Sequence, residues 1–542
     1  MPSQPLSPSG LREDNSGGVR EVLRIAFPLI MVNIGQSAKL FCDRLMLSWF
    51  DGHALSASFT GGITHFMFLT FFFGICGYAA TFVAQYTGAG RHERVGLVVW
   101  QAIGFSLVCG LLLALVGFAA RPIFDLMGHD PKVRAGEIEY FRVLMFGAGG
   151  PLLTAALASF WVGRGKTWTI VAMQALSILA NIFGNWWLIF GTGGCFELSR
   201  RAAAWTQAAQ TSGPGGALYA ALAAVFLWIE GALNASAVFL GIPRMGIAGA
   251  ALATIGTEFV SVLFLFVLFL LPGTRRHFGT WPRKFVDAAL MVRMIRFGLP
   301  NGIQFFVDVA SFNFFGILMG RYGPDVHFAA TVAFSSANIC VMPMIGLANA
   351  SGILVGQSIG AADIPHALRS VASGRNLIIL YSFVVGALLL FWPDRLSALF
   401  ARGGADGQAP ALALANEFLL FAVFYLVFDG LFFLFSAAIR GAGDTRFAMR
   451  LMAALAVGLL VIPSFAAYRF FGAGPKVLWS VLVAYVVISS LMFYWRYRQG
   501  AWQKMKVIEE TVIESPREAA SAPSLDTAIA ARTAESGRYY LP

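Results

Sequence analysis

Long apolar runs recur along the chain at steady spacing, and they limit its fold more than any other feature. Each run holds about 20 residues or more, which lets one helix cross the hydrocarbon core of a bilayer. We expect twelve such helices, near residues 22–48, 54–83, 96–120, 138–162, 168–190, 246–271, 292–320, 327–356, 374–393, 414–438, 448–471 and 477–496. The runs therefore predict an all-α membrane protein with twelve transmembrane helices.

The low charge of the chain excludes several soluble classes. Only 12% of the residues are charged and 58% are hydrophobic, whereas a soluble domain has about 25% charged residues. Such a chain cannot cover its surface in water, which excludes a soluble enzyme, a disordered scaffold and a coiled-coil rod. The net charge of +11 comes from basic residues spread through the loops, so no nucleic-acid partner is expected. The five Cys form no C-x-x-C pair, which argues against a disulfide framework or a zinc site.

Loop charges predict how the chain lies in the membrane. Twelve helices place both termini on one side, and the segments on that side hold almost twice as many Lys and Arg as those opposite. The side richer in Lys and Arg is usually cytoplasmic. We therefore expect a multi-pass protein of the cytoplasmic (inner) or plasma membrane with both termini in the cytoplasm. Residues 1–21 lack the apolar core of a cleaved signal peptide.

An internal repeat divides the chain. Pro28 and Pro300 lie 272 residues apart in corresponding helices, and the segments Val83–Gly90 and Val355–Ala362 keep the same offset. The loop Gly163–Thr167 resembles Gly441–Thr445 at an offset of 278. These matches predict two six-helix lobes with the same direction of travel, related by an axis along the membrane normal and enclosing a central cavity.

The predicted domain organisation follows from this repeat. Residues 191–245 interrupt the first half and contain an apolar stretch that is short for a membrane span. We interpret this segment as an extracytoplasmic insert with a short interfacial helix. The expected segments are a cytoplasmic N-terminal segment (1–21), an N-lobe of helices 1–6 (22–190 and 246–271), the insert (191–245), a C-lobe of helices 7–12 (292–496) and a disordered cytoplasmic tail (504–542).

Charged residues inside the apolar runs are the first candidates for function, because a charge is costly in hydrocarbon. Lys39 and Asp43 lie one helical turn apart in the first helix; they fit either a neutralising ion pair or a titrating site beside a cavity. Asp308 and Asp429 have no cationic partner within their own helices. Lone buried carboxylates tend to take up a proton or a cation, so these two are candidates for a coupling site that binds H+ or Na+.

Further polar candidates lie in the fifth and sixth helices. Asn181 and Asn185 are one turn apart, as are Thr254 and Glu258. Amide oxygens can ligate sodium or bond to a carboxylate's proton, although hydrogen bonds between helices explain them equally well.

The sequence lacks motifs for ATP binding and for catalysis. Gly163-Arg-Gly-Lys-Thr167 ends like a phosphate-binding loop, but Phe160 replaces its first glycine. The sequence contains no H-E-x-x-H or G-x-S-x-G motif and no clustered His. We therefore expect no enzyme and no cofactor apart from the coupling ion, with energy drawn from an ion gradient.

Three motifs together resemble those of one transporter family. They are Val-x-Gln-x-x-Gly-Ala after the second and eighth helices, Arg440-Gly-Ala-Gly-Asp-Thr445 after the tenth, and Asn181-Ile-Phe-Gly-Asn185-Trp in the fifth. The chain resembles the multidrug and toxic compound extrusion (MATE) family over about residues 20–500, apart from the insert. This resemblance implies a cation-coupled antiporter that exports organic cations and other amphipathic compounds.

The resemblance also implies roles for individual residues. Asp43 stands where the family has its first-helix Asp, and Asn181, Asn185 and Thr254 stand near its polar positions in the fifth and sixth helices. Asp308 and Asp429 occupy the places of the acids of the seventh and tenth helices.

Lys39 and Glu258 depart from the family pattern. Lys39 could occupy the place of a sodium ion, and a Lys39–Asp43–Glu258 cluster forms if the helices face one another. Our hypothesis is that Asp308 and Asp429 bind the coupling cation, while the N-lobe cluster is modified for protons or substrate.

Two alternatives remain open at this point. One is a flippase of the same superfamily for lipid-linked oligosaccharides or polyprenyl-linked sugars, although Lys39 is the one clear buried cation that could meet a phosphate. The other is a membrane-embedded enzyme or channel, which no motif supports. The expected partners are a small amphipathic or cationic substrate and the lipid bilayer, and we expect a monomer.

Overall fold

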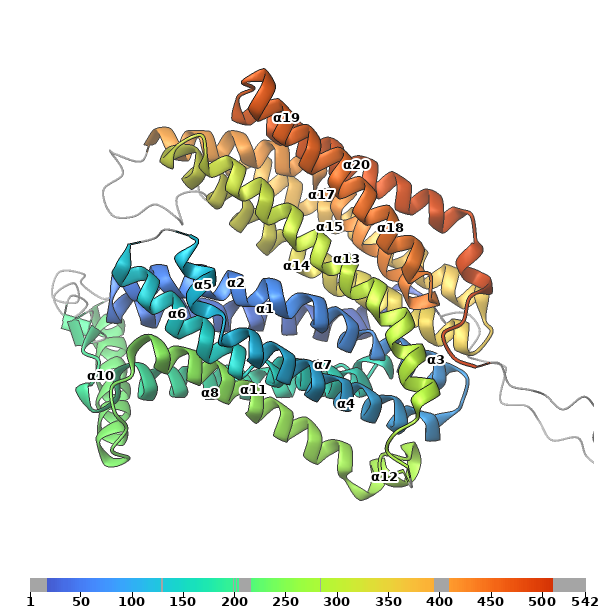
Figure 1. The fold of residues 1–542 in the computed structure, drawn as a ribbon, viewed down its shortest axis with the longest axis horizontal. Helices are drawn as coiled ribbons and strands as arrows, with labels where there is room; N and C mark the ends of the chain where they lie inside the picture. The colour runs from blue at the N-terminus through green and yellow to red at the C-terminus, as the bar shows by residue number, and fades with distance from the viewer. Residues whose placement is uncertain are drawn as a thin grey trace, which may run out of the picture. The chain divides into compact units, whose positions relative to one another are not determined.

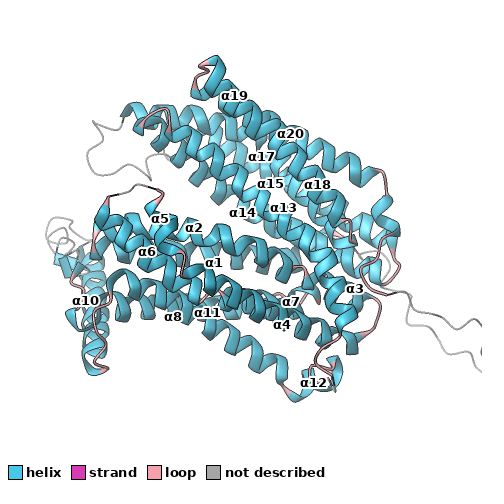
Figure 2. Ribbon diagram, in the orientation of Figure 1, coloured by secondary structure: helices cyan, strands magenta, loops and turns pink. Residues whose placement is uncertain are grey.

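The structure, a computed structural model, describes residues 17–127, 130–197, 199–200, 202–203, 216–282, 284–393 and 409–509. No residue in these ranges lies in a strand, and helices make up almost all of the described chain (Figure 2). The predicted all-α fold is confirmed. The helices are α1 (Val19–Phe50), α2 (Gly52–Gly77), α3 (Ala79–Gly88), α4 (His92–Gly117), α5 (Ala120–Asp125), α6 (Pro131–Phe146), α7 (Gly149–Gly163), α8 (Trp168–Asn185), α10 (Gly216–Phe239), α11 (Gly246–Leu270), α12 (Pro272–Phe278), α13 (Ala288–Gly320), α14 (Pro324–Gly360), α15 (Ile364–Phe391), α17 (Ala409–Ala442), α18 (Thr445–Leu455), α19 (Ile462–Phe471) and α20 (Pro475–Arg498).

The number of candidate membrane spans agrees with the prediction, but α10 is among them and the predicted fourth helix is not. Within the described ranges, 12 helices are long and apolar enough to cross a membrane, or up to 13 if one bent pair counts as a span. That pair is α6 and α7, which bend by 40° inside the predicted fourth helix, residues 138–162. The bend falls at Gly147 and Ala148, and Pro151 follows in the first turn of α7, where its missing N–H costs nothing.

Both halves of the chain share the same local irregularities. Pro28 lies inside α1 and Pro300 inside α13, at the two positions that begin the sequence repeat. A π-helical segment, Trp186–Phe190, extends α8, and a second, Ala456–Val461, joins α18 to α19. These irregular turns recur at the same place in each half, as a duplicated fold requires.

Each half also has apolar clusters of its own. Phe124, Phe141 and Leu152 lie in one cluster of the first half, and Leu47 and Trp186 lie in another. In the second half, Trp479 is fully buried against aromatic rings of α13, α14 and α17. Figure 1 shows α13–α20 on one side and α1–α8 with α11 on the other. The start of α1 packs with the cluster of the second half, through Val22, Ile25, Ala26 and Leu29.

The helix of the predicted insert is longer than expected. α10 has 24 residues, and its apolar part is long enough to count among the candidate spans, so its description as short was wrong. It runs across the ends of α8 and α11 rather than beside them (Figure 1). Asn234 and Ser236 of α10 accept hydrogen bonds from the indoles of Trp186 and Trp187 at 3.0 and 2.9 Å. An interfacial position for α10 stays a prediction.

The chain ends lie largely outside the described residues. Residues 1–16 and 510–542 are not described, and α1 begins at Val19, slightly before the predicted boundary at residue 22. The disorder predicted for residues 504–542 concerns mostly this part of the chain. Before it, Trp502 is buried and stacks on Tyr497 with ring centroids 5.3 Å apart.

Candidate functional site

Three helices of the first half bring six predicted site residues together. α1 contributes Lys39 and Asp43, α8 contributes Asn181 and Asn185, and α11 contributes Thr254 and Glu258. Each pair is spaced i, i+4, which places both side chains on one face of their helix. We call these six residues the N-lobe cluster.

Asp43 is held by amide and hydroxyl groups. The Asn185 Nδ2 donates to Asp43 Oδ1 and, at 3.1 Å, to Asn181 Oδ1. Thr254 Oγ1 lies 3.5 Å from Asp43 Oδ2 but only 3.0 Å from the Ala250 carbonyl oxygen, so its bond to the carboxylate is the weaker one. Asp43 is 5% exposed, and both asparagines are fully buried.

Lys39 pairs with Glu258 rather than with Asp43. Its Nζ lies 2.8 Å from Glu258 Oε1, and the two side chains are 4% and 13% exposed. Thr154 of α7, which sequence reasoning missed, donates to the other carboxylate oxygen of Glu258 at 3.1 Å. The neutralising pair is therefore Lys39–Glu258, and Asp43 carries the remaining negative charge of the N-lobe cluster.

Two atoms of this cluster retain unused hydrogen-bonding capacity. Asn185 Oδ1 and Asn181 Nδ2 are buried without a hydrogen-bond partner among the described residues. An unpaired amide oxygen beside a carboxylate suits a bound cation or the proton of a neutral carboxyl group. The cluster can therefore accept a further positive charge without rearranging its existing bonds.

The acids of the second half stand in a different environment. Asp308 lies in α13 and Asp429 in α17, where Asp429 is 8% exposed. Across the described ranges, no hydrogen bond or ion pair is found for either carboxylate. Arg440, three helical turns after Asp429 in α17, donates to Asn301 Oδ1 at 3.0 Å. We call Asp308 and Asp429 the C-lobe pair.

Two glutamines of the repeated motif join the halves reciprocally. Gln85 Nε2 of α3 donates to the carbonyl oxygens of Gly441 and Ala442 at 3.0 and 3.3 Å. Gln357 Nε2 of α14 donates to the carbonyl oxygen of Gly163 at 2.8 Å. Each glutamine thus reaches the loop motif of the other half. The motif was recognised in the sequence, but its spacing alone could not show that it closes the two halves against each other.

Other bonds lie at the same end of the molecule. Glu21 Oε2 lies 3.1 Å from His366 Nε2, and Tyr78 OH donates to the Arg440 carbonyl oxygen at 2.8 Å. These contacts join α1 to α15 and the junction of α2 and α3 to α17. The two halves are therefore closed against each other at the end where α3 and α14 terminate.

Close backbone contact at this closed end gives a testable prediction. A Cβ at Gly88 would lie 1.8 Å from the carbonyl oxygen of Gln357, so Gly88→Ala forces α3 and α14 apart. Overpacking typically costs about 1–3 kcal/mol, so we expect this closed state to be depleted by about 5- to 150-fold. The measurement is the labelling rate of a Cys introduced at Ala84, a buried residue of α3 that makes none of the closing hydrogen bonds described above, with and without Gly88→Ala. Gly77→Ala is the control, because its Cβ would meet nothing within 4 Å, and equal labelling in all variants would contradict the prediction.

A comparison with known families decides the identity of the fold. A model of the family described as MatE matches residues 28–187 and 300–465, once in each half. The chain belongs to the MatE family of transporters. The matches begin at Pro28 and Pro300, the positions that open the sequence repeat, and the chain is an integral multi-pass membrane protein.

Curated relatives of this MatE transporter match over most of its length. A probable multidrug resistance protein NorM of Burkholderia mallei is 25% identical over 487 residues, which cover 88% of this chain and 92% of that protein. A probable multidrug resistance protein NorM of Pseudomonas aeruginosa is 24% identical over 435 residues, covering 79% and 78%.

Solved structures share the fold. A MOP superfamily transporter from Pyrococcus furiosus, with a binding pocket described as of reverse polarity, matches with a TM-score of 0.73 at 17% identity and covers 91% of this chain and 98% of its own. The eukaryotic MATE transporter AtDTX14 matches with a TM-score of 0.70 at 17% identity, covering 90% and 96%. At these identities the likeness establishes the fold alone.

Proposed function

We propose that this MatE transporter is a cation-coupled secondary antiporter that exports organic cations or amphipathic drugs by alternating access. The names of the NorM relatives support the substrate class. The loop charges support an orientation with both termini in the cytoplasm, and the closed end of the structure is then the cytoplasmic one.

The proposed coupling to a cation rests on the C-lobe pair, Asp308 and Asp429. A charged carboxylate within a membrane span is costly unless a cation or a proton compensates it. Asp429 is largely buried, and neither Asp308 nor Asp429 has a hydrogen-bonded or ion-paired partner in the described part of the chain. The same carboxylates can therefore hold a coupling H+ or Na+ in one state and a cationic substrate in another.

The N-lobe cluster has a different role in this proposal. The Lys39 ammonium already neutralises the Glu258 carboxylate at 2.8 Å, so no metal cation is needed to compensate Glu258. Asp43 keeps a charge of its own, together with the unused Asn185 Oδ1. We assign this cluster to protons or to the substrate, and the C-lobe pair to the coupling cation.

Alternating access requires the closed end to open. The reciprocal bonds of Gln85 and Gln357 end on backbone carbonyl groups, and each neutral bond contributes only about 0.5–1.5 kcal/mol. Such bonds can close one face firmly and still separate within a transport cycle.

The test is uptake of a fluorescent organic cation into inverted membrane vesicles under an imposed proton or sodium gradient. Uptake that follows either gradient, and stops when a protonophore or sodium ionophore collapses it, supports the antiporter. Uptake that follows neither gradient would contradict it.

The flippase alternative is not favoured. A flippase for phosphate-linked lipids needs free buried cations, whereas Lys39 is engaged by Glu258 at 2.8 Å. Movement of a phosphate-linked sugar lipid without either gradient, in the same vesicles, would reverse this conclusion.

A further inference from the structure

A hollow lined by three arginines lies between α5 and α6, at the end opposite the closed one. Its volume is about 520 Å³, and it is lined by Arg121, Asp125, Pro131, Arg134, Ala135, Ile138, Glu139, Arg142 and Val143. Small-ligand sites typically have volumes of about 300–1,000 Å³. The hollow therefore has room for a phosphate-sized headgroup and part of what it is attached to.

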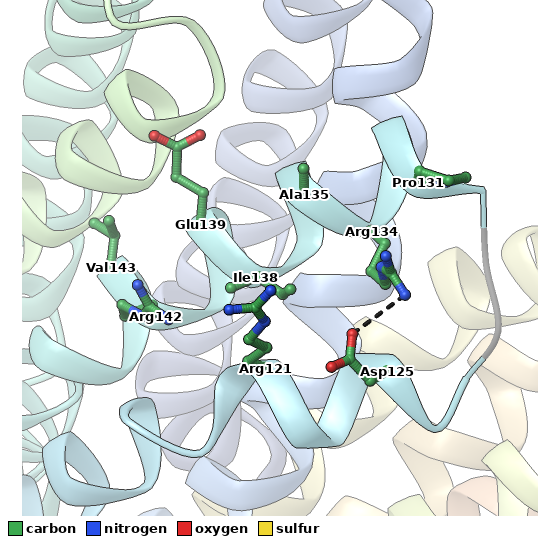
Figure 3. A pocket seen from close by; sticks show the side chains of 9 residues that line it. All are labelled: Arg121, Asp125, Pro131, Arg134, Ala135, Ile138, Glu139, Arg142 and Val143. Atoms are coloured by element: carbon green, nitrogen blue, oxygen red, sulfur yellow. Dashed lines mark ion pairs between the residues drawn. The ribbon is translucent and has the colours of Figure 1, made fainter.

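The charges in this hollow are not balanced among themselves. Arg134 Nη1 forms an ion pair with Asp125 Oδ1 at 3.3 Å. Arg121 and Arg142 form no ion pair with any described residue. Figure 3 shows the Arg121 guanidinium reaching from α5 over Ile138, between Arg142 and the Asp125–Arg134 pair, with the carboxylate of Glu139 directed away from it. Arg121 and Arg142 thus line the hollow without an ion-paired carboxylate in the described part of the chain.

An exposed apolar stripe of α4 leads directly to these arginines. Its members are spaced by four, four and three residues and are each between 57% and 70% exposed: Leu107, Leu111, Leu115 and Phe118. Arg121 follows Phe118 after three residues, and Arg142 precedes Phe146 by one turn. The rings of Phe118 and Phe146 are in contact, with centroids 5.3 Å apart. Both arginines are therefore the first cations beyond one continuous apolar surface.

An apolar stripe that ends in paired cations matches the shape of one ligand class. Acyl chains cover exposed apolar residues of a membrane span, and a guanidinium group binds phosphate oxygens through two parallel N–H donors. Basic pockets between membrane helices bind the phosphate-containing headgroups of anionic lipids, and the same chemistry applies to two guanidinium groups beside an apolar stripe.

We propose that this hollow is a binding site for an anionic phospholipid. Arg121 and Arg142 bind its phosphate, and its acyl chain lies along the stripe from Phe118 to Leu107. The site is separate from the N-lobe cluster and from the C-lobe pair, and it does not depend on the proposed transport activity.

Native mass spectrometry of the purified full-length protein tests this site. The protein, in detergent, is given equal amounts of phosphatidylglycerol and phosphatidylcholine. We expect it to retain phosphatidylglycerol in preference. An exposed ion pair contributes about 1.4- to 5-fold in affinity, so Arg121→Gln/Arg142→Gln is expected to lower the affinity for phosphatidylglycerol by about 2- to 30-fold. Arg321→Gln/Arg469→Gln removes the same charge from the exposed ends of α13 and α19 and is expected to retain the lipid like the wild type.

Three results would overturn the proposal. They are equal retention of both lipids by the wild type, unchanged retention by Arg121→Gln/Arg142→Gln, and displacement of the lipid by millimolar inorganic phosphate, which would indicate a site for free anions. Unfolding temperatures in phosphatidylcholine alone, equal for all variants, establish that the substitutions leave the fold intact. If the Gln variant does not fold, Arg121→Lys/Arg142→Lys replaces it, and we expect intermediate retention because Lys keeps the charge but loses the two-pronged contact.

Discussion

Replacing Asp308 and Asp429 with Asn in one variant is expected to reduce gradient-driven export to the level of vesicles without the transporter. Each substitution alone is expected to lower export by about 5- to 150-fold, the range given by typical coupling free energies. The physical reason is that Asn has nearly the same shape but cannot carry the charge that attracts a cation or binds a proton. The measurement is the rate of fluorescent cation uptake into inverted vesicles, at matched amounts of protein.

Glu417→Gln is the matched control for this prediction. Glu417 lies in α17, the same helix as Asp429, but its side chain is 48% exposed and pairs with Lys476. Its neutralisation is expected to leave export unchanged. Full gradient-driven export by the Asp308→Asn/Asp429→Asn variant would show that the C-lobe pair does not couple transport to an ion.

The second large effect is expected at the ion pair of the N-lobe cluster. Lys39→Met removes the ammonium group from a pair that is 4% and 13% exposed. Among the described residues, this leaves Thr154 as the one side-chain hydrogen-bond partner of the Glu258 carboxylate. Breaking a buried ion pair by removing one partner typically costs about 3–5 kcal/mol. We therefore expect a marked fall in unfolding temperature, measured on purified protein in detergent.

A second variant and a surface pair make this prediction specific. Lys39→Met/Glu258→Gln removes both charges and is expected to recover most of the lost stability, because no uncompensated charge remains. Lys476 and Glu417 lie at the same separation of 2.8 Å but are 60% and 48% exposed, so Lys476→Met should cost about 1 kcal/mol or less. If Lys39→Met were as mild as Lys476→Met, the buried pair would have no special role in the fold.

Much of the fold follows from the sequence because membrane spans have a strong and simple signal. The apolar runs and the repeated prolines, Pro28 and Pro300, predict the helices and their duplication without any knowledge of packing. The bend between α6 and α7 was missed, because a run of apolar residues with several glycines has the same composition whether or not the helix continues. α10 was judged short, because Glu230 interrupts its apolar run, whereas the helix continues past this residue to Phe239.

The candidate site was predictable only in part. The spacing of Lys39 and Asp43 shows that they share a helix face, but it cannot show which carboxylate the ammonium meets. That depends on how α11 packs against α1, which places Glu258 rather than Asp43 at 2.8 Å. The contact of Thr154 with Glu258 could not be predicted, because a single hydroxyl group in an apolar run is common in membrane helices. The loop motifs around Gln85 and Gln357 were visible, yet their contacts join residues far apart in the sequence.

The coupling of substrate movement to ion movement at the C-lobe pair is tested most directly in proteoliposomes. The purified protein is reconstituted, a fluorescent organic cation is added on one side, and the flux of H+ (with a pH-sensitive dye) and of Na+ (with a radioactive tracer) is followed without any imposed gradient. The predicted result is an ion flux opposite to the substrate in the wild type and in Glu417→Gln, and none in Asp308→Asn/Asp429→Asn. Substrate movement in the wild type without any ion flux, or an undiminished ion flux in the double variant, would contradict it.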